Sequence, residues 1–207
     1  MPITSSQESL DLVRKISLTV STCHEHHHIL YDVAKEFPND QEINYTEIGC
    51  FAGASACLML QRPKTKVTSI DIGTPIPQET VLKNISQYNI HNNFYRYIKG
   101  NSHDKQIKQM VADSFIDILF IDGGHEYEDV ITDFFMYSEL LSLEGFVIFD
   151  DYSHLQGCPG VKPAVDFIVK KFKSFDILGT VDNVLGARGV YENNHIGNCF
   201  IMKRRIY

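Results

Sequence analysis

The chain has 207 residues, 43% hydrophobic and 22% charged, which suits one domain with a packed core and excludes wholesale disorder. Its net charge of −7 argues against a general nucleic-acid binder, because phosphate contacts require an excess of Lys and Arg. No apolar run approaches the roughly 20 residues that span a bilayer, and the N-terminus lacks the apolar core of a secretory signal. The five scattered cysteines contain no CxxC pair, so we expect reduced thiols in a cytoplasmic protein.

Two helices are predicted before the first strand, over Gln7–Thr19 and Glu25–Phe37. Both are too short to bury a core of their own. We therefore expect residues 1–41 to form a helical cover over the sheet or its opening.

From Glu42 onward, short apolar runs rich in β-branched residues alternate with longer segments of helical period. Strands are predicted over Ile43–Ile48, Val67–Ile72, Phe94–Ile98, Ile116–Ile121, Phe146–Phe149, Ile177–Val181 and Asn198–Met202. Helices are predicted over Ala54–Gln61, Gln78–Asn89, Lys105–Ala112, Tyr127–Leu143 and Lys162–Phe172. This alternation is typical of a doubly wound α/β fold with a seven-stranded, mostly parallel sheet. Ligands of such sheets bind beyond the carboxyl ends of the strands.

The first strand is followed by a glycine turn that contains Gly49 and Gly53. Glycines let the backbone turn sharply and approach a ligand closely. The spacing differs from the Gly-x-Gly-x-x-Gly of dinucleotide binders, and Glu47 stands two residues ahead of the first glycine. An acid at that place suits a cationic amine better than a pyrophosphate, although a tight strand–helix turn without a ligand is the alternative.

Acidic residues close four of the predicted strands: Glu47, Asp71, Asp122 and Asp150. An acid at the end of the second strand is placed to bind both hydroxyls of a ribose. A carboxylate at a buried strand end needs a partner, so four of them favour a shared site. The alternative is that each acid caps a separate helix.

Two groups of residues carry a resemblance to a known family. The motif Glu47-x-Gly49-x-x-x-Gly53-x-Ser55, together with Asp71, resembles the cofactor motifs of the class I S-adenosylmethionine-dependent methyltransferases. The Ile-Asp-Gly-Gly-His run at 121–125 and the Asp-Asp-Tyr at 150–152 are similar to the metal-dependent O-methyltransferases.

Among those enzymes, the chain most resembles the macrocin-type group, which methylates sugar hydroxyls of natural products, and more distantly catechol O-methyltransferase. The resemblance covers about residues 42 to 202. It implies a Rossmann-like methyltransferase fold and a single methyltransferase domain over residues 1–207, with residues 42–207 as its α/β core.

The resemblance also implies roles for individual residues in binding S-adenosylmethionine. Gly49 and the turn through Gly53 lie under the methionine part of the cofactor. Glu47 faces the ammonium group and Ser55 reaches the carboxylate. Asp71 binds the ribose hydroxyls.

The adenine and metal sites are implied in the same way. Ser102 and His103 lie near adenine, although catechol O-methyltransferase has Gln where this chain has His103. Asp122, which also borders the cofactor, and Asp150 and Asp151 match a magnesium site. His125 falls where catechol O-methyltransferase has its lysine base.

The chemistry of these residue types agrees with the resemblance. A divalent cation that binds an alcohol lowers its pKa, and a nearby base removes the proton. Carboxylate oxygens with open coordination positions suit Mg²⁺. We therefore predict an enzyme that uses S-adenosylmethionine and Mg²⁺, or another divalent cation, to methylate a hydroxyl of a small molecule such as a sugar or glycoside. His125 and Asp122 are its predicted catalytic residues.

Neither a nucleic acid nor a membrane is expected as a partner, and assembly into a homo-oligomer is left open. One alternative is a catalytically silent module that binds S-adenosylmethionine or a nucleotide. Another is an NAD(P)-dependent oxidoreductase, which would require the missing Gly-x-Gly-x-x-Gly.

A competing motif occurs near the N-terminus, where residues 24–28 read His-Glu-His-His-His. This matches the H-E-x-x-H pattern of zinc hydrolases, with Glu47 as a conceivable third ligand. We reject this interpretation because the motif lies outside the predicted sheet and Glu47 belongs to the glycine turn. The segment is expected to be a surface helix end or an adventitious nickel site, and its histidines could still line the substrate entrance.

Overall fold

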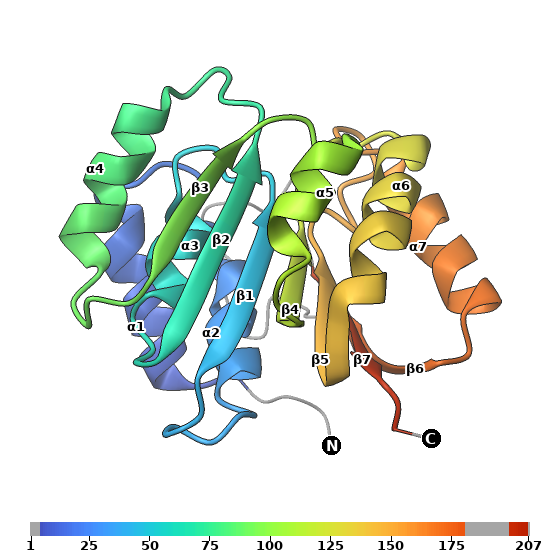
Figure 1. Cartoon of the computed structure of the whole chain (residues 1–207), viewed down its shortest axis with the longest axis horizontal. Helices are drawn as coiled ribbons and strands as arrows, with labels where there is room; N and C mark the ends of the chain where they lie inside the picture. Colours follow the sequence, from blue (N-terminus) through green and yellow to red (C-terminus); the bar gives the residue numbers. More distant parts are fainter. Residues whose placement is uncertain (1–4, 181–198, 207) are drawn as a thin grey trace.

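The computed structural model describes residues 5–180 and 199–206 and contains a seven-stranded sheet in the order β3-β2-β1-β4-β5-β7-β6 (Figure 1). Strands β1 to β5 pair in parallel, whereas β7 is antiparallel to both of its neighbours. The predicted fold class, a mostly parallel Rossmann-like sheet, is therefore confirmed. The strands are β1 (Ile43–Ile48), β2 (Thr65–Asp71), β3 (Tyr95–Lys99), β4 (Ile116–Ile121), β5 (Leu141–Phe149), β6 (Phe175–Thr180) and β7 (Phe200–Arg204).

Helices cover both faces of the sheet, with α1 to α4 on one face and α5 to α7 on the other (Figure 1). They are α1 (Gln7–Ser17), α2 (His28–Ala34), α3 (Ala54–Met59), α4 (Gln78–Tyr88), α5 (Lys105–Val111), α6 (Tyr127–Tyr137) and α7 (Val161–Lys171). Two short 3₁₀ helices, η1 (Glu25–His27) and η2 (Ser138–Leu140), accompany them. Within the described ranges, no helix has both the length and the apolar character needed to cross a membrane.

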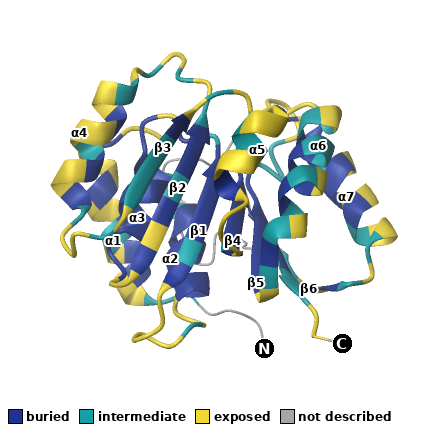
Figure 2. Ribbon diagram, in the orientation of Figure 1, coloured by how far each residue is buried: buried dark blue, intermediate teal, exposed yellow. Residues whose placement is uncertain are grey.

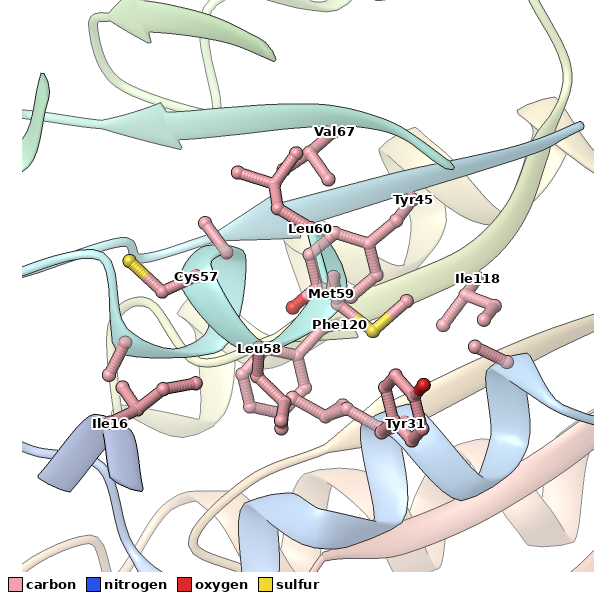
Figure 3. Packing of buried hydrophobic residues seen from close by; sticks show 14 of the residues in the cluster. Ile16, Tyr31, Tyr45, Cys57, Leu58, Met59, Leu60, Val67, Ile118 and Phe120 are labelled. Atoms are coloured by element: carbon pink, nitrogen blue, oxygen red, sulfur yellow. The ribbon is translucent and has the colours of Figure 1, made fainter. Parts of the chain in front are cut away.

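The central strands are buried on both faces, which explains their nearly continuous apolar sequences (Figure 2). Successive residues of a strand point to opposite faces, so Phe120 of β4 faces α1 to α4 while its neighbour Leu119 faces α5 to α7. Figure 3 shows the first of these two cores, where Tyr45 and Phe120 lie among side chains of α3 such as Leu58 and Met59. The sheet is thus held rigidly between two apolar layers.

Several predicted boundaries differ from those observed. The helix expected over Tyr127–Leu143 ends at Tyr137, continues as η2, and gives way to β5 at Leu141. Leu141 is buried in β5 and would also continue the apolar stripe of a longer helix. The spacing of apolar residues therefore could not distinguish a longer helix from an earlier strand. Two predicted strand ends, Val181 and Asn198, lie outside the described residues.

The predicted helix Glu25–Phe37 is divided into η1 and the shorter α2. Asp32 of α2 fixes the start of α1, since its carboxylate accepts hydrogen bonds from Ser6 Oγ at 2.6 Å and from Ser9 Oγ at 2.7 Å. Helices α1 and α2 pack on each other and on α3, and together they cover one face of the sheet. This arrangement carries η1 to the carboxyl edge of the sheet, where its histidines meet the end of β5.

Candidate active site

A cavity of about 480 Å³ opens at the carboxyl ends of β1 to β5. This is the edge at which parallel α/β sheets bind their ligands. Eight of the predicted site residues line it: Gly49, Asp71, Ser102, His103, Asp122, His125, Asp150 and Asp151. The structure thus brings together residues from five separate strand ends.

Gly49 begins the turn after β1 and touches the end of β4. Its φ is +85°, and a Cβ on it would stand 1.8 Å from the carbonyl oxygen of Asp122. Its N–H donates to the carbonyl of Ile70 at 2.9 Å, which ties the turn to β2 as well. Only a glycine allows the backbone of β1 to approach β4 this closely while the turn remains open to the cavity.

Asp71 ends β2 and holds the same turn from the other side. Its Oδ2 accepts the N–H groups of Cys50 at 2.8 Å and Phe51 at 2.9 Å, and its Oδ1 accepts that of Gly73 at 2.6 Å. The carboxylate also borders the cavity. Asp71 therefore shapes the turn, and its predicted contact with ribose hydroxyls would use the acceptor capacity that the backbone leaves free.

Glu47 and Ser55 lie beneath the turn and do not line the cavity. Glu47 Oε2 accepts from Ser55 Oγ at 2.6 Å and from Tyr45 at 2.9 Å, while Oε1 accepts from Ser69 Oγ at 2.6 Å. Burial raises the pKa of Glu47, although these hydroxyl donors oppose the shift. Gly53, at the start of α3, also lies outside the cavity lining. The contacts predicted for these three residues with the methionine part stay predictions.

Ser102 and His103 follow β3 and rest against Asp133 of α6, a residue that the sequence did not indicate. Asp133 is fully buried, and His103 Nε2 approaches its Oδ1 to 3.3 Å without the alignment of a hydrogen bond. Burial raises the pKa of Asp133 from 3.8 to about 6, against the opposing influence of Ser102 and His103. A carboxylate so placed costs stability whenever it is ionised.

Replacing Asp133 by Asn should therefore stabilise the protein in a pH-dependent way. The folded protein holds this proton more tightly than the unfolded chain, so wild-type stability falls as pH rises from about 4 to about 6. The advantage of Asp133→Asn should grow over that range to at most about 3 kcal/mol and then stay constant. Urea unfolding of both proteins at several pH values measures it, and a difference independent of pH would contradict the assignment.

The carboxylates of Asp122, Asp150 and Asp151 border the cavity at the ends of β4 and β5, beside His125. His125 Nε2 lies 3.2 Å from Asp151 Oδ2 and 4.0 Å from Asp122 Oδ1. Burial, reinforced by the charge of Asp150, raises the pKa of Asp122 to about 7. The neighbouring carboxylates of Asp122 and Asp151 raise the pKa of His125 to about 10. The pocket thus gathers more negative charge than its described side chains neutralise.

Two histidines of η1 reach this cluster, and sequence reasoning assigned them elsewhere. His27 Nε2 lies 2.9 Å from Asp150 Oδ2, and His26 Nε2 lies 2.8 Å from Asp150 Oδ1. Both rings are buried, so the expectation of a surface helix end was wrong. Burial alone would raise the pKa of Asp150, but the two histidines outweigh it and hold the pKa well below its usual range. No local pattern reveals a contact between residues 123 positions apart.

The structure does not place His24 and His28 as joint zinc ligands, in agreement with the rejection of the H-E-x-x-H motif from the sequence. His24 is in an extended conformation ahead of η1, so it does not share a helix face with His28. Both ring nitrogens of His28 already have partners, Ser5 Oγ at 2.6 Å and the carbonyl of Glu25 at 2.9 Å. His24 instead lines the cavity, where a histidine at the substrate entrance was considered.

The residues present fit a divalent cation. Within the described ranges, one oxygen of Asp122, one of Asp150 and a nitrogen of His27 lie within 4.8 Å of one another. A cation among them would also stabilise the ionised form of Asp122, whose pKa is raised by burial and by the charge of Asp150. It would likewise compete with the proton on His125 and lower the pKa of that imidazole.

Comparisons with known proteins agree with the fold. The sequence profile of a family described as a methyltransferase domain matches residues 46–152. The uncharacterized protein R132 of Acanthamoeba polyphaga mimivirus is 35% identical over 195 residues, covering 88% of each chain.

Solved structures share the fold at low sequence identity. A putative caffeoyl-CoA O-methyltransferase from Staphylococcus aureus is 19% identical with a TM-score of 0.66, covering 97% of this chain and 93% of that one. The O-methyltransferase TomG from Streptomyces achromogenes, solved in complex with S-adenosylmethionine, is 12% identical with a TM-score of 0.65 over 99% of this chain and 92% of that one. With more than half of its residues matched by the family profile, the chain belongs to the methyltransferase domain family, and its fold is that of the class I S-adenosylmethionine-dependent methyltransferases.

Proposed function

We propose that the protein transfers the methyl group of S-adenosylmethionine to a hydroxyl of a small molecule, with a divalent cation held at Asp122, Asp150 and Asp151. The observation that carries this proposal is the convergence of these carboxylates and His125 on one cavity beside the Gly49 turn. Mg²⁺ is the cation that the three carboxylates suggest, because it prefers oxygen ligands and retains water in its open positions.

The reaction exchanges one bond for another. The bond between the sulfonium sulfur and the methyl carbon breaks, a bond from that carbon to the acceptor oxygen forms, and S-adenosylhomocysteine leaves. When bound, the cation lowers the pKa of the acceptor hydroxyl. His125 would accept the proton of that hydroxyl in its neutral form, which a bound cation would favour, because its Nε2 borders the cavity beside Asp151. The rigid strand ends hold these groups in line, which is the main demand of a displacement at carbon.

We place a sugar or glycoside foremost among the acceptors. The support is the resemblance of the Asp-Asp-Tyr segment at 150–152 to the macrocin-type enzymes. The cavity also offers polar groups beyond the carboxylates, among them Thr22, Thr74 and Asn101. Such groups suit a ligand with several hydroxyls better than a purely aromatic one.

The test is a methyl-transfer assay with matched acceptors. The protein and S-adenosylmethionine are incubated with glycosides and phenols, and with amine and carboxylate analogues of the same molecules. S-adenosylhomocysteine and the mass of the product are measured. We expect transfer to hydroxyls that stops with EDTA and returns when Mg²⁺ or Mn²⁺ is restored. Transfer to amines or carboxylates instead, or activity undiminished by EDTA, would contradict the proposal.

A further inference from the structure

The histidine pair of η1 is placed as a source of metal ligands. His26 and His27 face the two carboxylate oxygens of Asp150 at 2.8 Å and 2.9 Å. Their rings lie edge to face with centroids 4.6 Å apart, and both are more than nine-tenths buried. The imidazoles therefore enter the cluster from a segment that does not belong to the strand ends.

The hydrogen bonds around this pair are incomplete within the described part of the chain. His26 Nε2 is buried and has no aligned hydrogen bond, despite its short distance to Asp150 Oδ1. A buried polar atom without a partner calls for an explanation. Adjacent ligands of an octahedral ion with bonds of about 2.1 Å lie roughly 3 Å apart, which matches both distances from the histidines to Asp150.

The ends of β4 and β5 complete the set. The oxygens of Asp122 and Asp150 and the nitrogen of His27 are mutually within 4.8 Å, so one ion can touch all three. Cys199 Sγ lies 3.5 Å from Asp150 Oδ1 and joins His26 and Asp150 in a second group of the same spacing. A donor set of imidazole and carboxylate differs from the all-oxygen surroundings that Mg²⁺ prefers.

We propose that the His26–His27 pair supplies at least one nitrogen ligand, from His27 foremost, to the divalent cation at Asp122 and Asp150. The site then favours a transition-metal ion such as Mn²⁺, Co²⁺ or Zn²⁺ over Mg²⁺. This inference rests on the metal site of the proposed function and specifies its ligands and its metal class. It also assigns a role to η1, whose histidines contact Asp150 at the end of β5.

Pulsed electron paramagnetic resonance on the full chain loaded with Mn²⁺ tests the ligand directly. A bound imidazole gives a nitrogen hyperfine coupling, which we expect in the wild type and in His125→Gln. The coupling should vanish in the double variant His26→Gln, His27→Gln, whose amides can still donate to Asp150. His91→Gln is the matched control, because His91 bonds the carbonyl of Gln61 at 3.0 Å, outside the cavity.

Calorimetric titration with Mn²⁺ and with Mg²⁺ supplies a second readout. The double variant should bind Mn²⁺ at least about 10- to 100-fold more weakly than the wild type, because even a residue that only hydrogen-bonds a metal ligand contributes that much. The change in Mg²⁺ affinity should be much smaller. Melting temperature and affinity for S-adenosylhomocysteine show whether the variant is folded. If it is not, the wild type and His125→Gln decide: no nitrogen coupling in the wild type, or its loss in His125→Gln, overturns the inference.

The outcome is separable from that of the methyl-transfer assay. Hydroxyl methylation supported by a cation that shows no nitrogen coupling retains the proposed function and rejects histidine ligation. Nitrogen coupling in a protein that methylates no hydroxyl retains the ligation and rejects the proposed acceptor class.

Discussion

Asp122→Ala is expected to lower the rate of methyl transfer by roughly 10²- to 10⁴-fold, the range that acid–base and metal assistance supply. The side chain borders the cavity beside His125. One of its oxygens lies within 4.8 Å of ligand atoms of His27 and Asp150, so a single cation can contact all three residues. Its structural contacts, by contrast, are made by the main chain: the N–H donates to Ile48 at 2.8 Å, and the carbonyl packs against Gly49. Removing the carboxylate should therefore leave the turn, and the affinity for S-adenosylhomocysteine, nearly intact.

Asp150→Asn should have the same effect on transfer, and it keeps the shape of the side chain next to His26 and His27. Asp113→Ala, which removes an exposed acid after α5, serves as the control for net charge. Product formation and calorimetry with S-adenosylhomocysteine measure the two effects separately. Unchanged turnover in either site variant would refute the metal-assisted mechanism, and a parallel loss of cofactor affinity would reassign the carboxylate to cofactor binding.

Gly49→Ala is expected to destabilise the fold by several kcal/mol and to abolish cofactor binding. An L residue in the left-handed region costs about 1–2 kcal/mol, and overpacking against a rigid neighbour adds about 1–3 kcal/mol. Here the neighbour is the backbone of Asp122, which cannot rotate away from a Cβ 1.8 Å from its carbonyl oxygen. Against a typical total stability of about 5–15 kcal/mol, this loss is large.

Gly179→Ala isolates the steric contribution to that loss. Gly179 of β6 also has a positive φ, +107°, but no atom of the described residues lies within 4 Å of the position that its Cβ would take. Chemical unfolding of both variants therefore separates backbone strain from the collision with Asp122. Equal destabilisation by the two substitutions would show that the close approach of β1 and β4 is unimportant.

The order and type of the main elements followed from the sequence because its signals are local and repeated. The strands over Ile43–Ile48 and Ile116–Ile121 have the predicted boundaries, since polar or turn-forming residues flank buried apolar runs. The acids that close the strands were informative for a similar reason: parallel strands end at one edge, so Asp71, Asp122 and Asp150 border one cavity.

Other parts of the site depend on tertiary contacts that have no local signature. The histidines of η1 looked like a surface tract because their partner, Asp150, lies far along the chain. Asp133 is one polar residue inside an apolar helical stripe, and its approach to His103 arises only when α6 packs beside the segment that follows β3. The hydroxyl partners of Glu47 are likewise fixed by the register of β1 and β2 and by the position of α3.

The position of β7 bears on how the chain acquires this sheet during synthesis. β7 lies between β5 and β6, and among the described strands β6 pairs with β7 alone. The edge of β5 is complete only once β7 has been made, about 50 residues later, which at about 5–20 residues per second takes roughly 3–10 s. During that interval the apolar edge of β5, next to the candidate active site, lacks its partner strand. Chaperone protection of the ribosome-bound chain would matter most in that window.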